Sequence, residues 1–517
     1  MRQHTILSLA LALTATTLQA QTSSIIPLAN TIEITATDTP ESIIQKAAHV
    51  VPTSIQQTAM EKEFIAFVHF GPNTFTRMEW GTGTENPQVF NLKEIDTDQW
   101  CAALKAAGMK LVILTAKHHD GFVLWQSRYT RHGVMSSPFQ KGKGDIVKEL
   151  SASCRKYGLQ MGIYLSPADL YQMEHPDGLY GNGSKATERV IPREVSGQPF
   201  RNKTQFKFVV DDYNEYYLNQ LFELLTEYGP IHEIWLDGAH PKQKGGQTYN
   251  YHAWREMIKT LAPEAVIFGR DEIRWCGNEA GHTREAEWNV LPYTVNPDTL
   301  SHFPNMMEED LGSREKLYTA RFLHYHPTEV DTSIRDGWFY RDDSLQRIRP
   351  EEEVFDIYER SVGNNSILLL NIPPNREGRF SPTDVQVLKD TGARIHNTYD
   401  TDLLQGANGP AEVLDNRLDT FIPLEKELII TTPAPVTFNR LMLQEAVATH
   451  GERVEAHAID AWIDGHWQEI AQAKNIGNKR IHRFPDVTTD RIRLRIEAAR
   501  FTPALSRISA HYYQKPQ

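Results

Sequence analysis

A repeated alternation of short apolar runs and helical patterns occupies the chain from about residue 64 to residue 372. The apolar runs are 64–71, 111–121, 161–166, 231–238, 265–270 and 366–374, and the helical patterns are 100–109, 144–158, 213–229 and 352–363. Strands that alternate with helices over this length predict a parallel sheet, and they favour a closed (β/α)8-like TIM barrel over an open sheet. The stretch 270–336 is less regular, and the sequence does not assign its strands.

The helical pattern at 213–229 carries a clear apolar face. Its apolar residues recur at helical spacing, at Tyr213, Tyr217, Leu221, Leu224 and Tyr228. This spacing predicts one buried face on an amphipathic helix.

The pattern changes after about residue 375. Short alternating segments follow at 428–436, 440–447, 455–470 and 491–499, separated by turn-rich pieces. Such segments predict an all-β sandwich. We therefore expect a barrel domain at 21–398 and a β-sandwich domain at 399–517.

The first twenty residues have the pattern of an export signal. Arg2 provides a positive charge, residues 6–13 are apolar, and small residues precede Gln21. We expect residues 1–20 to be a bacterial-type signal peptide and the protein to be periplasmic or secreted. The apolar stretch is too short to span a bilayer, and no later run is long enough, so no membrane span is expected.

Charge and cysteine content exclude several classes of function. The formal net charge of −12 disfavours nucleic acid as the main partner, because binding to phosphates requires a basic face. The three cysteines, Cys101, Cys154 and Cys276, are too widely spaced for a disulfide framework or a zinc pattern. Cys101 and Cys154 lie in helical patterns and are expected in the core. A neutral ligand fits this composition better.

Polar or ionisable residues end five of the apolar runs. They are His69, the group His118, His119 and Asp120, Tyr164, Asp237 and Arg270. In a barrel these strand ends converge on one face, where ligands bind. Each residue also has a structural alternative, such as a satisfied core histidine or a turn aspartate. Adjacent histidines in a strand point to opposite faces, so His118 and His119 are poorly placed to bind one metal ion together. A metal site would also need a third ligand and a better spacing.

Asp237 lies between an apolar strand and Gly238. Among these strand-end residues it is the one that a purely structural role, such as that of a turn aspartate, explains least well. The strand behind it would hold its carboxylate at a fixed position on the rim. Tryptophans that can stack on the apolar face of a sugar occur in loop-like contexts at positions 80, 125, 275, 288 and 338. A positioned carboxylate beside an aromatic rim, with no metal set, indicates glycoside chemistry.

Five co-linear motifs resemble a known family. They are FVHFGPNTFTRMEWGTG, AKHHDGFVLWQS, GIYLSPAD, EIWLDGA and NNSILLLNIPPNREGRF, between about residues 60 and 395. They are similar to the motifs of the α-L-fucosidases of glycoside hydrolase family 29. This resemblance implies a barrel fold and hydrolysis of fucosides with retention of configuration, without a cofactor or a metal.

The resemblance also implies roles for individual residues. Asp237 matches the family's nucleophile. The residues that match its sugar-binding positions are His69, Glu79, Trp80, His118, His119, Tyr164 and Trp338, the last of which would pack against the methyl group of fucose.

The general acid/base varies in position within the family, so several candidates remain. Glu279 in RWCGNEAG resembles the acid/base of the branch that prefers α-1,3/1,4-linked fucose. Glu285 and Glu287 are the alternatives. Arg274 is expected to bind the sugar or orient a carboxylate, and Arg270 is the competing choice.

The expected function is therefore an exported α-L-fucosidase that acts on α-1,3/1,4-linked fucose of branched glycans. Its partners would be fucosylated oligosaccharides or glycoconjugates. A broad-specificity fucosidase of the same family, a non-catalytic carbohydrate-binding protein and a metal-dependent hydrolase are the alternatives, and a transfucosylase would use the same chemistry.

The C-terminal region resembles discoidin-like sandwiches related to family 32 carbohydrate-binding modules, mainly through the segment VLDNRLDTF. Trp462 and Trp467 lie in its predicted hairpin. They are expected in the sandwich core, and glycan binding is the alternative.

Overall fold

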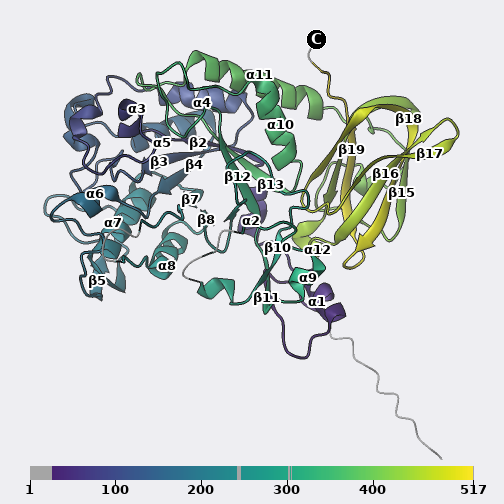
Figure 1. The fold of residues 1–517 in the computed structure, drawn as a ribbon, viewed down its shortest axis with the longest axis horizontal. Coiled ribbons are helices and arrows are strands. Elements are labelled where there is room, and N and C mark those ends of the chain that lie inside the picture. Colours follow the sequence, from purple (N-terminus) through teal and green to yellow (C-terminus); the bar gives the residue numbers. More distant parts are fainter. Residues whose placement is uncertain (1–25, 242–245, 301–302, 304–305, 516–517) are drawn as a thin grey trace, which may run out of the picture.

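The computed structural model describes residues 26–241, 246–300, 303 and 306–515. Its N-terminal part is a nearly closed barrel of parallel strands surrounded by helices (Figure 1). The barrel strands are β2 (Phe64–Val68), β3 (Leu111–Lys117), β4 (Gln160–Leu165), β7 (Glu233–Trp235), β8 (Val266–Phe268), β9 (Arg274–Trp275), β12 (Thr328–Ser333) and β13 (Ser366–Asn371). This architecture confirms the predicted (β/α)8-like barrel. The predicted signal peptide lies outside the described residues.

The barrel strands pair in the order β8-β7-β4-β3-β2-β13-β12-β9. Each of these neighbouring pairs is parallel, and β13 pairs with β2, so the sheet curves back on itself. Between β8 and β9 the described residues form only an isolated bridge, Phe268 with Ile273. The barrel is therefore incompletely paired at this one place.

Helices cover the outside of the barrel (Figure 1). They include α4 (Thr97–Ala106), α5 (Ile146–Tyr157), α7 (Asp212–Glu227), α8 (Tyr251–Leu261), α10 (Glu351–Ser361) and α11 (Pro382–Tyr399). Local chemistry sets the ends of α5: the Asp145 side chain accepts a hydrogen bond from the Lys148 amide, and Gly158 terminates the helix at φ +70°. Cys101 and Cys154 are buried in α4 and α5, as predicted.

Helix α7 is more deeply buried than one apolar face requires. Most of its residues are inaccessible to solvent, including polar ones such as Asn219 and Glu223. The antiparallel hairpin β5 (Thr187–Ile191) and β6 (Phe206–Val210) contacts it, and Arg189 donates hydrogen bonds from β5 to Asp212 and Glu215. The hairpin thus encloses a helix that the sequence predicts to be exposed on one side.

The irregular stretch after β8 forms a small second sheet beside the barrel. Strands β1 (Thr31–Glu33), β11 (Phe322–Tyr325) and β10 (Val290–Tyr293) pair antiparallel. Although they are far apart in the sequence, α1 (Pro40–Ala47) contacts α9 (Arg314–Leu317), whereas α2 (Ser54–Met60) contacts β8 and β13 of the barrel. Among the described helices, none combines the length and apolar character needed to cross a membrane.

The C-terminal part is a six-stranded antiparallel sheet. Its strands are β14 (Ile422–Pro423), β15 (Glu427–Glu445), β16 (Val454–Ile463), β17 (His466–Ala473), β18 (Arg480–Ala499) and β19 (Ala504–His511). The two long strands β15 and β18 contain register shifts, and the sheet bends over a core of its own. Trp462 and Trp467 are only half-buried, so the prediction that they are core residues was wrong. They pack edge to face at the hairpin, where Arg491 and Arg493 lie over their rings.

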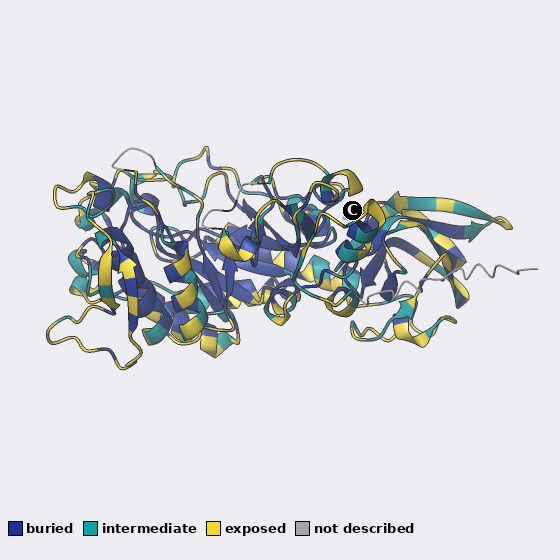
Figure 2. Cartoon of the chain, turned by 90° about the horizontal axis from the view of Figure 1, so that it is seen from below, coloured by how far each residue is buried: buried dark blue, intermediate teal, exposed yellow. Residues whose placement is uncertain are grey.

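The barrel and the C-terminal sheet lie side by side along the long axis of the molecule (Figure 2). Their contact includes buried charge: Arg440 on β15 pairs with Glu359 on α10. Glu452 accepts hydrogen bonds from the amides of Asn289 and Val290 and from the Asn365 side chain. Since a buried charge is costly unless it is paired, these contacts fix the two parts against each other.

Candidate active site

A cavity of about 170 Å³ opens at the carboxyl ends of the barrel strands. Its lining comes from several strands and the loops that follow them, as expected of a barrel of this type. Nine of the predicted site residues line it: His69, Glu79, Trp80, His118, His119, Tyr164, Asp237, Glu279 and Trp338. Arg274 does not line this cavity and instead lines a neighbouring one.

Asp237 follows strand β7 and is held from two sides. The Tyr164 hydroxyl donates to its Oδ2 at 3.0 Å, and the Ala239 amide donates to its Oδ1 at 2.7 Å. Nε2 of His119 lies 3.6 Å from Oδ2, beyond hydrogen-bonding distance. With 26% of its side chain exposed, this carboxylate is fixed in place yet accessible to a ligand.

His69 presents a hydrogen-bond acceptor to the cavity. Its Nδ1 lies 2.9 Å from Oδ1 of Asn371, whose amide nitrogen donates to Ser333 and to the Trp338 carbonyl. Because Oδ1 can only accept, Nδ1 carries the ring proton and Nε2 keeps its lone pair. Burial lowers the pKa of His69 to about 3, so the ring stays neutral.

His119 has the same arrangement. Its Nδ1 lies 2.7 Å from the Ser166 hydroxyl, which itself donates to the Ala168 carbonyl. Nδ1 must therefore donate, which leaves Nε2 as an acceptor. Burial lowers the pKa of His119 and lowers that of His118 well below its usual range. The site thus holds neutral imidazoles that can accept hydrogen bonds from hydroxyl groups.

Aromatic side chains and one further carboxylate complete the wall. Trp80 is largely exposed and lies 4.0 Å, ring to ring, from His119, and Trp338 lies 4.9 Å from His69. The Trp338 amide donates to Oε2 of Glu79 at 2.8 Å, whereas Oε1 of Glu79 has no hydrogen-bond partner among the described residues. Gly337 permits this approach, because a Cβ there would lie 2.4 Å from that Oε1.

Glu279 lines the cavity and is exposed to solvent on one side. Partial burial of its carboxyl and the negative charge of Asp237 raise the pKa of Glu279, while a hydrogen bond with the Trp338 side chain acts in the opposite direction. The hydroxyl of Thr332 fixes the backbone of Glu279 by donating to its carbonyl at 2.9 Å. One carboxylate that is fixed and one carboxyl group whose pKa is raised therefore share this cavity.

Asp331 on β12 also lines the cavity, although it was not among the site residues predicted from the sequence. Burial and the nearby Glu279 raise its pKa to about 8, and the Trp275 indole donates to its Oδ1 at 2.8 Å. Below it lie Glu329 and Glu233, whose pKa values are raised mainly by burial, for Glu233 to about 7. The spacing of Glu329 and Asp331 in one strand places both on the same face, a signal that could have revealed them.

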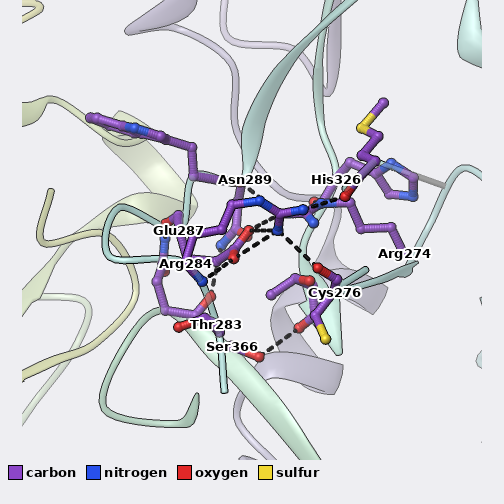
Figure 3. Close-up of polar contacts among 12 residues, drawn as sticks. Arg274, Cys276, Thr283, Arg284, Glu287, Asn289, His326 and Ser366 are labelled. Atoms are coloured by element: carbon purple, nitrogen blue, oxygen red, sulfur yellow. Dashed lines mark hydrogen bonds and ion pairs between the residues drawn. The ribbon is translucent and has the colours of Figure 1, made fainter. Parts of the chain in front are cut away.

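Glu287 lies in a separate, fully buried cluster (Figure 3). Its carboxylate pairs with Nη2 of Arg274 and, at 3.1 Å, with Nη1 of Arg284. Arg274 also donates to the carbonyls of His326 and Trp288. Glu287 lines neither cavity at this end of the barrel, whereas Glu279 lines both. Glu285 is exposed and lines neither cavity as well.

Cys276, the third cysteine, is buried beside this cluster, and its thiol donates to the Asn278 carbonyl at 3.0 Å. Within residues 26–241, 246–300, 303 and 306–515, no group of three His, Cys, Asp or Glu side chains is placed to hold a metal ion.

Comparison with known proteins is consistent with this geometry. A family profile described as Alpha-L-fucosidase matches residues 49–398. Alpha-L-fucosidase 1 of Arabidopsis thaliana is 34% identical over 484 residues, which cover 88% of this chain and 86% of the relative.

Two solved structures extend the similarity to the whole fold. A structure described as a putative alpha-L-fucosidase from Bacteroides ovatus is 37% identical, with a TM-score of 0.81, and the match covers 95% of this chain and 79% of that one. A family 29 fucosidase of Ruminococcus gnavus in complex with fucose is 28% identical, with a TM-score of 0.75, and the match covers 90% of this chain and 95% of that one.

Proposed function

The chain belongs to the α-L-fucosidase family of glycoside hydrolases, and we propose that it releases terminal L-fucose with retention of configuration, using Asp237 as nucleophile and Glu279 as acid/base. The observation that carries this proposal is the cavity that holds both carboxyl groups beside neutral histidine acceptors. Retaining glycosidases require two carboxyl groups about 5–5.5 Å apart, one to attack and one to transfer protons.

In the first step, Asp237 attacks the anomeric carbon while the bond from that carbon to the leaving oxygen breaks. Glu279 gives its proton to the leaving oxygen, and a covalent fucosyl-enzyme forms. Tyr164 and the Ala239 amide keep the attacking carboxylate in line. Partial burial and the negative charge of Asp237 raise the pKa of Glu279, which is the direction that a proton donor requires.

In the second step, Glu279 takes a proton from water, whose oxygen attacks the anomeric carbon and releases Asp237. Both carboxyl groups return to their initial states, so the cycle is balanced. Nε2 of His69 and Nε2 of His119 accept hydrogen bonds from the sugar hydroxyls. These bonds favour catalysis to the extent that they strengthen in the transition state.

The anomer released first tests the proposed stereochemistry. We expect proton NMR of the reaction with an aryl α-L-fucoside to show α-fucose first, with β-fucose appearing only by mutarotation. Initial formation of β-fucose would contradict a covalent intermediate on Asp237. Binding without any release of fucose would instead favour the carbohydrate-binding alternative.

The preferred linkage is proposed to be α-1,3/1,4. The segment that contains Trp275 and Glu279 supports this preference through its resemblance to that branch of the family. A panel of Lewis-type trisaccharides, α-1,2-linked fucosides and aryl fucosides checks it. Similar kcat/KM values across the panel would favour the broad-specificity alternative.

Export and metal independence are further parts of the proposal. The N-terminal sequence supports export to the periplasm or beyond, and a mature protein that begins at Gln21 is the expected result of N-terminal sequencing. Full activity in excess chelator is expected, because the proposed steps use only carboxyl groups and water. Loss of activity that is restored by a divalent cation would support the metal-dependent alternative.

A further inference from the structure

A second cavity, of about 330 Å³, adjoins the first. The two share Trp235, Asp237, Glu279 and Asp331 in their linings. The second cavity continues toward the gap between β8 and β9, where it is lined by Arg270 and Arg274. The proton donor of a glycosidase must face the leaving oxygen, so a cavity that continues from Glu279 away from the histidines would hold the sugar that leaves.

Arg270 is buried in the wall of this second cavity, and no described carboxylate accepts a hydrogen bond from it. Only 1% of the residue is exposed, and its Nε and Nη1 have no hydrogen-bond partner among the described residues. Its guanidinium lies over the Tyr251 ring at 4.8 Å. The adjacent Asp271 is occupied, because Arg255 donates to both of its oxygens at 3.2 and 2.9 Å.

Arg274 lies in the same wall and also has an N–H donor without a hydrogen-bond partner among the described residues. Nε and Nη2 donate within the Glu287 cluster, whereas Nη1 is buried and has no partner among the described residues. Glu287 is paired with two arginines, Arg274 and Arg284. One negative charge faces two positive charges, so this cluster carries a surplus positive charge. Two cationic groups with unused N–H donors therefore line one cavity.

The acidic groups of the cavity do not cancel this charge. Asp331, with a pKa of about 8, is mainly protonated at neutral pH. Asp237 and Glu279 lie at the shared end and are engaged in the reaction proposed above. A buried guanidinium without a carboxylate is costly, and an anionic ligand group would relieve that cost through charge-assisted hydrogen bonds. Asp271 favours the Arg270 cation but is shared with Arg255. A neutral hydroxyl could accept the hydrogen bonds but would leave the remaining positive charge uncompensated.

We infer that Arg270 and Arg274 form an anion-binding subsite for the leaving glycan, which takes a carboxylate or a sulfate ester on the sugars next to the fucose. This inference rests on the proposed fucosidase function. It predicts that acidic fucosylated glycans are better substrates than their neutral counterparts, although the protein as a whole is acidic.

The test compares three substrates that share one fucose linkage. They are a neutral Lewis-type trisaccharide, the same trisaccharide with a terminal sialic acid, and the same trisaccharide with a sulfate ester. We expect kcat/KM for at least one acidic form to exceed that of the neutral form by about tenfold, the size of one charged hydrogen bond. If kcat/KM rises for the sialylated form, the site binds a carboxylate; if it rises for the sulfated form, the site binds a sulfate ester.

Two variants at one position separate charge from shape. Arg270→Met should reduce the acidic-to-neutral ratio of kcat/KM to about one, whereas Arg270→Lys should keep most of it. Dividing by the neutral substrate for each variant cancels any general loss of folding or chemistry. A wild-type ratio of one or less for both acidic forms, or an unchanged ratio in Arg270→Met, would overturn the inference.

A binding measurement keeps this outcome distinct from failure of the proposed function. The wild-type chain is titrated with N-acetylneuraminic acid, with N-acetylglucosamine 6-sulfate and with neutral N-acetylglucosamine, and tryptophan fluorescence is followed. Binding of an acidic sugar that weakens about tenfold in Arg270→Met supports the subsite even if no fucose is released. Equal affinity for acidic and neutral sugars overturns the subsite even if fucose is released.

Discussion

Two glutamates eight residues apart in the sequence, Glu279 and Glu287, have opposite environments. Glu279 is exposed to solvent on one side, lines the cavity with Asp237 and has a raised pKa. Glu287 is fully buried and is neutralised by two arginines (Figure 3). Glu279 can therefore exchange a proton with a ligand or with water, whereas Glu287 forms buried ion pairs that stabilise the fold.

The largest effect is expected for Asp237, the proposed nucleophile. Asp237→Ala should reduce fucose release by a factor on the order of 10⁴ or more, because no covalent intermediate can form. Its unfolding midpoint in urea should change little, since Asp237 is partly exposed and the only basic group near it among the described residues is His119, whose pKa is lowered by burial. Wild-type-like turnover would remove Asp237 from the mechanism.

The next effect concerns the proton donor. Glu279→Ala should slow substrates with poor leaving groups by about 10²- to 10⁴-fold, while activated aryl fucosides are less affected at the first step. Azide should restore part of the rate and yield a fucosyl azide, because it replaces water without needing a general base. Rescue by azide in Glu287→Ala, but not in Glu279→Ala, would reverse the assignment of the two glutamates.

Substitution in the buried cluster should affect stability more than chemistry. Glu287→Gln leaves two buried arginines without their carboxylate and should lower the free energy of unfolding by about 3–5 kcal/mol. Urea denaturation measures this loss. The exposed neighbour Glu285→Gln is the matched control, expected within about 0.5 kcal/mol of wild type. Equal stability of the two variants would mean that the cluster contributes little.

The smallest expected effect is a change in the pH dependence of stability. Asp331 has a pKa of about 8 in the folded chain and near 3.8 when unfolded, so between these values the folded chain binds more protons. Stability therefore decreases as pH rises through this window. Asp331→Asn removes that contribution, so its melting temperature should fall less between pH 5 and pH 8. Equal decreases in both proteins would show that Asp331 does not titrate as described.

The sequence predicted most of the barrel because its long strands are continuous apolar runs bounded by helical patterns. Strand β9 could not be predicted, since a two-residue strand has no periodicity and is held by pairing with β12. Strand β12 was missed because Glu329 and Asp331 interrupt its apolar character. These acids are tolerated in the barrel by raised pKa values and by hydrogen bonds from Trp235 and Trp275.

For the candidate site, the sequence could predict which strand ends meet, but not how deeply each side chain is buried. Strand topology alone brings His69, Tyr164 and Asp237 to one rim, so their meeting follows from the order of the strands. The choice between Glu279 and Glu287 depends on burial and on which arginines approach, and neither is visible in a local motif. Arg270 illustrates the same limit, because its missing acceptor is a property of the folded neighbourhood.

The contact between the C-terminal sheet and the Glu287 cluster has a consequence for engineering. The Asn475 side chain, between β17 and β18, donates to the Glu287 carbonyl at 2.6 Å, and Asn365 of the barrel donates to the same oxygen at 2.9 Å. A shortened chain that ends after α11 would lose the first of these donors and the Glu452 carboxylate together. We therefore expect that replacing the C-terminal sheet by that of a relative destabilises the barrel unless the contacts of Asn475 and Glu452 are kept. A chimera should retain both residues at these positions.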